Sequence, residues 1–135
     1  MKKILLTIAL TSWAAIMVTA QNILTEPITW NVDQLNDISR NVSVPYHCKF
    51  ATNGNQTIIW SQKNNTYVTE LSVQSTSGSW ANVSEPGQIT YTVSLNGQMG
   101  TLVFERNAQG MHITLDFANA NGPRLNHRYS VISIN

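Results

Sequence analysis

The segment QITYTVSLNG, residues 88–97, alternates apolar and polar side chains and ends in an Asn-Gly pair. Its apolar residues fall on one side of an extended chain and its polar residues on the other. That pattern is typical of a strand with one face in a core and one in water. Asn96-Gly97 suits the positive φ angles of a two-residue hairpin turn. The segment therefore predicts an antiparallel strand that turns directly into the next one.

Further strands are expected outward from this segment in both directions, some with the same alternation and others apolar on both faces or mixed in pattern. The strands that we expect are residues 23–30, 42–50, 56–62, 67–74, 88–95, 101–106, 111–117 and 128–134. The first of them contains Pro27, which favours an edge or a bulge. Short turns rich in Asn and Gly separate most of the strands, so consecutive strands should be antiparallel neighbours in a meander.

Residues 31–40 are the one stretch with a helical pattern. Asn31 is a suitable N-cap, and the apolar residues Val32, Leu35 and Ile38 recur every three positions. The pattern predicts a short helix near the N-terminus, of two turns at most.

About eight strands from about 115 residues predict an all-β fold, either a small closed barrel or a two-sheet sandwich. The order of a strand, a short helix and an unbroken meander resembles ligand-carrying barrels of the lipocalin and fatty-acid-binding type. The resemblance lies in element order alone and rests on no residue motif. It implies a barrel whose interior holds a small apolar or amphipathic ligand.

The N-terminal segment, residues 1–20, has the composition of a secretory signal peptide. Two lysines, an apolar run and small residues before the end of the segment suit cleavage after Ala20. Gln21 follows where a bacterial lipoprotein would need cysteine, so we expect no lipid anchor. We therefore expect residues 21–135 to be a single all-β domain of bacterial type, secreted or periplasmic.

The charge balance is close to neutral. The chain has 8 Lys or Arg and 7 Asp or Glu residues, and loss of the two signal-peptide lysines brings the net charge to about −1. No basic stripe runs along the sequence, so neither nucleic acid nor an anionic membrane is an expected partner. No apolar run is long enough to predict membrane insertion. A small molecule or a glycan remains possible, and the oligomeric state stays open.

Residues with catalytic or metal-binding chemistry are spread along the chain. His112 and Asp116 share a strand face, but residues four apart on a strand lie about 13 Å apart and cannot form a dyad alone. His47, His112 and His127 lie on three strands, and their spacing alone neither makes nor excludes a metal site, which is rare on base rate. Cys48 alternates in phase with core residues and should be buried. We therefore predict no catalytic residue, no cofactor and no metal site.

Aromatic residues are the best candidates for ligand contacts. Trp80 follows the loop-like Ser77-Gly78-Ser79 and is expected to be exposed, where its ring would stack on a sugar or a partner. The other aromatic rings either line an interior pocket or fill the core. The candidate ligand-binding residues are Trp80, Trp30, Trp60 and Tyr129.

Three functional hypotheses follow. The first is a secreted, non-enzymatic binding domain with a small ligand in a barrel interior, which a filled interior without a cavity would contradict. The second is a carbohydrate- or protein-binding surface module, centred on exposed tryptophan. The third is a hydrolase whose site residues converge from several strands, which a cleft with titratable groups of shifted pKa would support.

Overall fold

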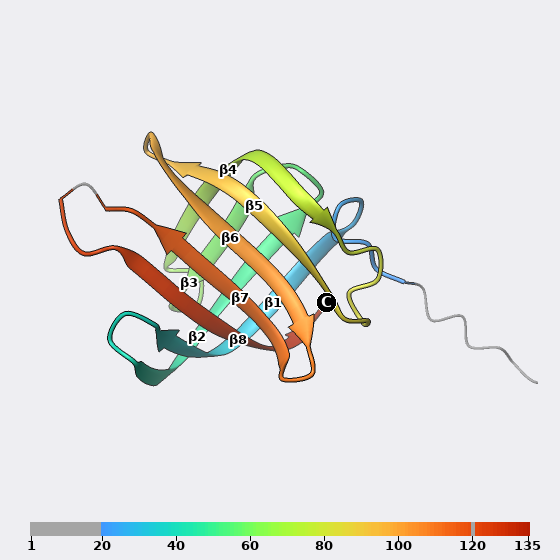
Figure 1. The fold of residues 1–135 in the computed structure, drawn as a ribbon, viewed down its shortest axis with the longest axis horizontal. Coiled ribbons are helices and arrows are strands. Elements are labelled where there is room, and N and C mark those ends of the chain that lie inside the picture. Colours follow the sequence, from blue (N-terminus) through green and yellow to red (C-terminus); the bar gives the residue numbers. More distant parts are fainter. Residues whose placement is uncertain (1–19, 120) are drawn as a thin grey trace, which may run out of the picture.

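The computed structural model describes residues 20–119 and 121–135. The signal peptide predicted for residues 1–20 therefore lies, apart from Ala20, outside the described residues. Eight antiparallel strands, each hydrogen-bonded to the next in sequence, close into one barrel (Figure 1). The strands are β1 (Pro27–Asp37), β2 (Val42–Asn53), β3 (Ile58–Gln62), β4 (Tyr67–Ser79), β5 (Gly87–Leu95), β6 (Gln98–Asn107), β7 (Gly110–Phe117) and β8 (Leu125–Ile134).

Pairing of β8 with β1 completes the ring. The predicted all-β meander is thus confirmed, and the alternative that the sequence left open is decided in favour of the barrel over the sandwich. The Asn-Gly turn between β5 and β6 has the expected geometry, with φ of 51° at Asn96 and 80° at Gly97. β1 begins only at Pro27 and has a partner on each side, so Pro27 marks a strand start and not an edge.

The short helix predicted for residues 31–40 is wrong, and the described residues contain no helix. Most of that stretch belongs to β1, whose pairing with both neighbouring strands shifts register between Val32 and Gln34. Trp30 and Val32 are buried, and after this β-bulge Leu35 packs against the core. One extra residue in a strand therefore produced the three-residue spacing that imitates a helix.

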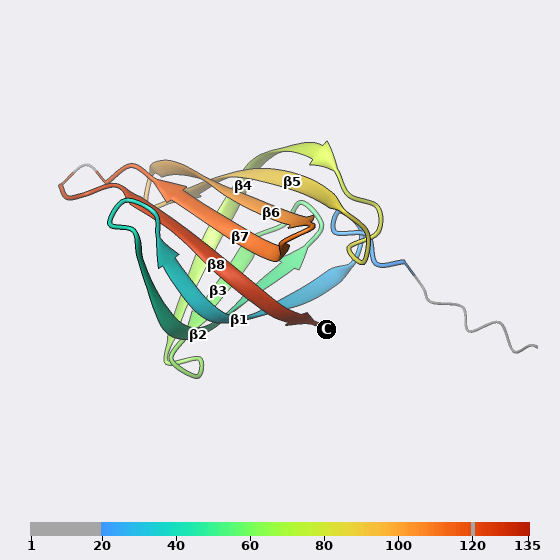
Figure 2. The same ribbon diagram turned by 60° about the horizontal axis from the view of Figure 1, so that its bottom comes forward.

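The two ends of the barrel differ. We call the end that carries the N-terminal segment and the β2–β3, β4–β5 and β6–β7 loops the filled end, and the opposite end the open end. The N-terminal segment and the β4–β5 loop lie together over the filled end (Figure 2). Ile23 and Val83 are fully buried there, and the backbone N–H of Val83 donates to the carbonyl of Gln21 at 3.0 Å. This end of the barrel is plugged by its own chain.

Candidate functional site

Trp80 is part of the plug and not a surface residue. Its side chain is only 3% exposed, and its indole N–H donates to the backbone carbonyl of Glu85 at 2.8 Å. Its ring centroid lies 5.7 Å from that of Trp30. The expectation of an exposed Trp80 was wrong because the residues before it do not form a loop: β4 continues to Ser79 and directs the next residue back over the barrel end.

Trp30 also belongs to the core of the filled end. Its side chain is 1% exposed, its ring lies 5.0 Å from Phe104, and its indole N–H donates to the Thr52 hydroxyl at 3.0 Å. The buried N–H is thus satisfied within the protein. Neither Trp30 nor Trp80 presents a ring face to an external ligand.

Trp60 and Tyr129, the other two candidates, lie deeper along the barrel with Phe50. The Phe50 and Trp60 rings stack with centroids 5.6 Å apart, and Tyr129 lies 5.3 Å from Phe50 and 6.0 Å from Trp60. We call these three rings the aromatic layer. It lies between the plugged core and the open end, because Trp60 contacts hollow space on its other side.

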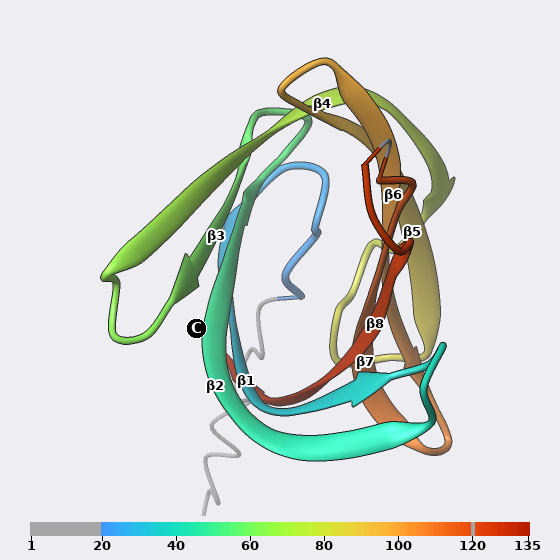
Figure 3. The same ribbon diagram turned by 90° about the vertical axis from the view of Figure 1, so that its left-hand side faces the viewer.

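The first hollow lies inside the open end and has a volume of about 140 Å³. A cavity of about this size, lined by apolar side chains, is large enough for one aromatic ring. Gln98 and Asn119 form a polar part of its edge. Its apolar lining consists of Trp60, Leu71, Leu95, Leu115, Phe117, Ala118 and Leu125. Figure 3 looks onto this end of the barrel, where the β3–β4 hairpin leans away from the other strands.

The second hollow, of about 370 Å³, is lined by residues of the β1–β2 hairpin and by one residue of β8. Its lining combines apolar and charged side chains: Leu35, Asp37, Arg40, Val42, Val44 and His127. Both hollows reach β8, the first at Leu125 and the second at His127. These two residues alternate in phase with buried Tyr129, so the two hollows flank the inner face of one strand.

A row of polar groups connects the aromatic layer to the mouth of the second hollow. The Tyr129 hydroxyl lies 3.4 Å from Nδ1 of His127, and Nε2 of His127 lies 3.8 Å from an Asp37 carboxylate oxygen. The backbone N–H of Arg40 donates to the same carboxylate at 3.1 Å. Burial raises the pKa of Tyr129, and nearby Cys48 and Tyr46 add smaller contributions in the same direction, so this phenol stays protonated. The open end therefore places polar groups beside apolar walls.

Inward-facing apolar side chains at the open end are not covered. Val42 is 49% exposed, Val44 40% and Leu125 39%, although all three line the hollows. Positions in the same phase at the filled end are buried completely, as at Ile28 and Ile89. Inside a barrel of eight strands, side chains either fill the interior or surround a ligand. Here the protein's own side chains fill one end and leave the other unfilled.

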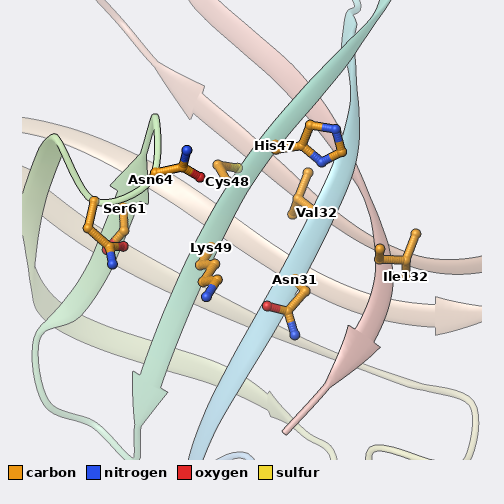
Figure 4. Close-up of a pocket in the computed structure, with 9 residues that line it drawn as sticks. Asn31, Val32, His47, Cys48, Lys49, Ser61, Asn64 and Ile132 are labelled. Carbon is orange, nitrogen blue, oxygen red and sulfur yellow. The ribbon is translucent and has the colours of Figure 1, made fainter.

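A third hollow, of about 270 Å³, lies on the outer wall of the barrel (Figure 4). It crosses β8, β1, β2 and β3, and Asn31, His47 and Lys49 project along neighbouring strands there. Most of its lining residues are polar, and they include no Trp, Tyr or Phe ring. With Trp80 buried as well, this surface lacks the stacking platform on which the carbohydrate-binding hypothesis rested.

The groups considered for catalysis lie on different parts of the structure. Asp116 forms a bidentate ion pair with Arg124, with distances of 2.6 and 2.8 Å, which lowers the pKa of the carboxyl. His112 is the cross-strand neighbour of Glu105, which pairs with Arg128 at 3.4 Å. Within residues 20–119 and 121–135, no group of three His, Cys, Asp or Glu side chains is placed to hold a metal ion. No helix formed by these residues is long and apolar enough to cross a membrane.

Comparisons with protein families, with curated proteins and with solved structures found no match to this chain. The class of protein is therefore defined by its own geometry: an eight-stranded up-and-down β-barrel that is plugged at one end and open at the other.

The sequence pointed to two of the residues around the open end, Trp60 and Tyr129, and missed most of the rest. Val42, Val44 and Leu125 match the alternation of ordinary core residues. They are distinguished only by their position next to hairpin loops at the open end. An inward-facing side chain at such a position is buried only if another part of the molecule covers that end of the barrel.

Proposed function

We propose that the protein is a non-enzymatic binding barrel that holds a small apolar or amphipathic ligand at its open end. The observation that carries this proposal is the exposure of inward-facing apolar residues around the two hollows. Covering apolar surface stabilises by roughly 25 cal/mol per Å². A ligand at the open end would bury these apolar side chains, which the polypeptide itself leaves exposed.

The chemistry of the two hollows suits an amphipathic ligand. Against Trp60, Leu71 and Leu115, the first hollow accepts an apolar group such as a ring or a short chain. The second hollow is large enough for the rest of a small molecule and offers polar contacts at Asp37 and His127. We propose binding in preference to catalysis because the lining is mostly apolar.

We also propose that the protein works outside the cytoplasm, as the composition of residues 1–20 suggests. The native ligand would then be a molecule of the periplasm or the exterior. The single cysteine, Cys48, is buried within the barrel wall and can form no internal disulfide.

Native mass spectrometry of the protein recovered from an exporting host tests the proposal. We expect an adduct that is present under native conditions and lost on denaturation, and its mass identifies the ligand class. After the adduct is stripped, the fluorescent amphiphile 8-anilinonaphthalene-1-sulfonate should bind saturably at one site. An unliganded native mass together with no saturable dye binding would refute the proposal.

A further inference from the structure

The exposed large apolar side chains are concentrated at one end of the molecule. Among the described residues they are Ile38, Val42, Val44, Tyr67, Val68, Met99, Leu125 and Ile132. All of them except Ile132 lie in the β1–β2 loop or within three residues of a hairpin loop at the open end. We call these seven residues the rim. Exposed apolar groups scattered over a surface need no explanation, but a ring of them around an opening indicates a contact surface.

Charge divides between the ends in the same way. The loops at the open end contain Arg40, Lys63 and Arg124 and no acidic residue, whereas those at the filled end contain Glu26 and Glu85 and no basic residue.

Two of the three cations at the open end are neutralised by nearby acids. Asp37 and Asp116, at adjoining strand ends, lie 3.8 Å from Arg40 and 2.6 Å from Arg124. The excess positive charge at the rim therefore comes from Lys63, whose ammonium lies 5.1 Å from the ring centroid of Tyr67.

We infer that the open end docks on the surface of an anionic lipid bilayer, with the rim residues among the headgroups; this rests on the proposed function. Aliphatic and aromatic tips flanked by Lys and Arg are the combination that binds to a bilayer interface. The β1–β2, β3–β4 and β7–β8 hairpins carry the cations, and a fluid surface accommodates such separate projections. Docked in this way, the hollows open directly toward the lipid phase, which dissolves the class of ligand that they suit.

A second copy of the chain is a poorer occupant of the same surface. Two open ends placed face to face would bring together two surfaces that each carry the excess positive charge of Lys63. Like charges in a contact are unfavourable. The sequence did not indicate an anionic membrane because the three cations at the open end are far apart along the chain and meet only through the barrel topology.

Vesicle sedimentation tests the inference directly. The protein recovered from an exporting host is first checked by intact mass, because a retained signal peptide would itself bind bilayers. It is then mixed with vesicles of phosphatidylcholine alone and with vesicles that contain about a third phosphatidylglycerol. We expect binding to the anionic vesicles to be at least about fivefold stronger and to weaken as salt is raised.

Matched variants separate the rim from the rest of the surface. The double variant Ile38→Ser/Val68→Ser should lose about tenfold in vesicle partitioning, because two apolar tips are removed. Ile132→Ser removes an even more exposed apolar residue from the outer wall and should change nothing. Lys63→Glu should abolish the preference for anionic vesicles, whereas Lys49→Glu, on the outer wall, should keep it.

Three results would overturn the inference: no binding to either kind of vesicle, equal losses in the Ile132→Ser and rim variants, or a dimer that Ile38→Ser/Val68→Ser disrupts without vesicle binding. The proposed function is distinguished by native mass spectrometry of the same variants. Ile38 and Val68 line neither hollow, so their replacement should leave the ligand adduct in place.

Discussion

Trp60 of β3 and Tyr129 of β8 meet inside the barrel with ring centroids 6.0 Å apart, although β1 and β2 separate their strands in the sheet. The contact marks the level at which the interior changes from filled to open. On one side the chain supplies its own plug, with Trp30 and Trp80 in contact. On the other, Trp60 lines a hollow of about 140 Å³.

The plug should be sensitive to a single added methyl group at Gly87. A Cβ at this position would lie 2.1 Å from Cδ1 of the buried Trp80 ring. We expect Gly87→Ala to lower the free energy of unfolding by about 2 kcal/mol through overpacking. Urea denaturation followed by tryptophan fluorescence measures the change.

Gly97→Ala is the matched control for this substitution. A Cβ at Gly97 would have no atom within 4 Å, and its cost should come only from the φ of +80°, about 1 kcal/mol. Equal unfolding midpoints for the two variants would show that Trp80 does not pack against Gly87.

Filling the open end should block ligand binding without unfolding the barrel. Leu125 lines the first hollow and is 39% exposed. The indole ring of the Leu125→Trp variant therefore has room to cover the hollow. We expect dye affinity to fall about tenfold or more while stability changes by less than about 0.5 kcal/mol. Ile132→Trp adds the same ring to the outer wall and should bind dye normally. Similar losses in both variants would place the dye elsewhere.

His112 should make the protein less stable in mild acid. Burial, with a further contribution from nearby Arg128, lowers its pKa below the ordinary 6.5, and Glu105 partly opposes this. As pH falls through about 6.5, the unfolded chain takes up a proton on this imidazole before the folded chain does. The contribution to stability is therefore complete above that pH and is lost as pH falls toward the lowered pKa.

His112→Gln should remove this part of the pH dependence. We expect the free energy of unfolding to fall less between about pH 7.5 and about pH 5.5 in the variant than in the original protein, as measured by urea titration at each pH. Identical slopes would assign the acid sensitivity to other groups.

Cys48 should react slowly while the barrel is folded. Its side chain is 6% exposed, and burial raises the pKa of the thiol to about 12. Only the thiolate attacks a disulfide reagent, so at about pH 8 we expect labelling by dithionitrobenzoate to be at least about a hundredfold slower than in the unfolded protein. The same sample in guanidinium chloride supplies the reference rate. Rapid stoichiometric labelling of the native protein would contradict the burial.

Much of the fold was predictable because one face of most strands is buried and the other is solvated. The segment with Ile89, Tyr91 and Val93 forms β5 nearly as its alternation predicts, and those three residues are buried. The part of β1 after Asn31 was not predictable as a strand. The bulge after Val32 shifts its alternation by one residue and imitates the spacing of a helix. Only the pairing of β1 with two neighbours reveals that shift.

The candidate site was less predictable for a different reason. Whether an apolar residue is core or cavity wall depends on what lies across the barrel from it, and this is set by closure and not by local pattern. Leu71 is 1% exposed and Leu125 39%, yet both line the same hollow. Trp80 illustrates the reverse case, since a residue in a loop-like context became the plug of the barrel.

Closure of the ring by β1 and β8 also has a consequence for how the chain acquires its structure. Trp30 of β1 pairs with Ile134 of β8, so β1 acquires its second partner only after β8 has left the ribosome. Every other strand pair joins neighbours in the chain. The pairing of β1 with β8 therefore carries most of the entropy cost of closing a long loop. Until it forms, β1 and β8 each present a bare backbone edge, so closure of the ring is the step that protects the molecule from aggregation.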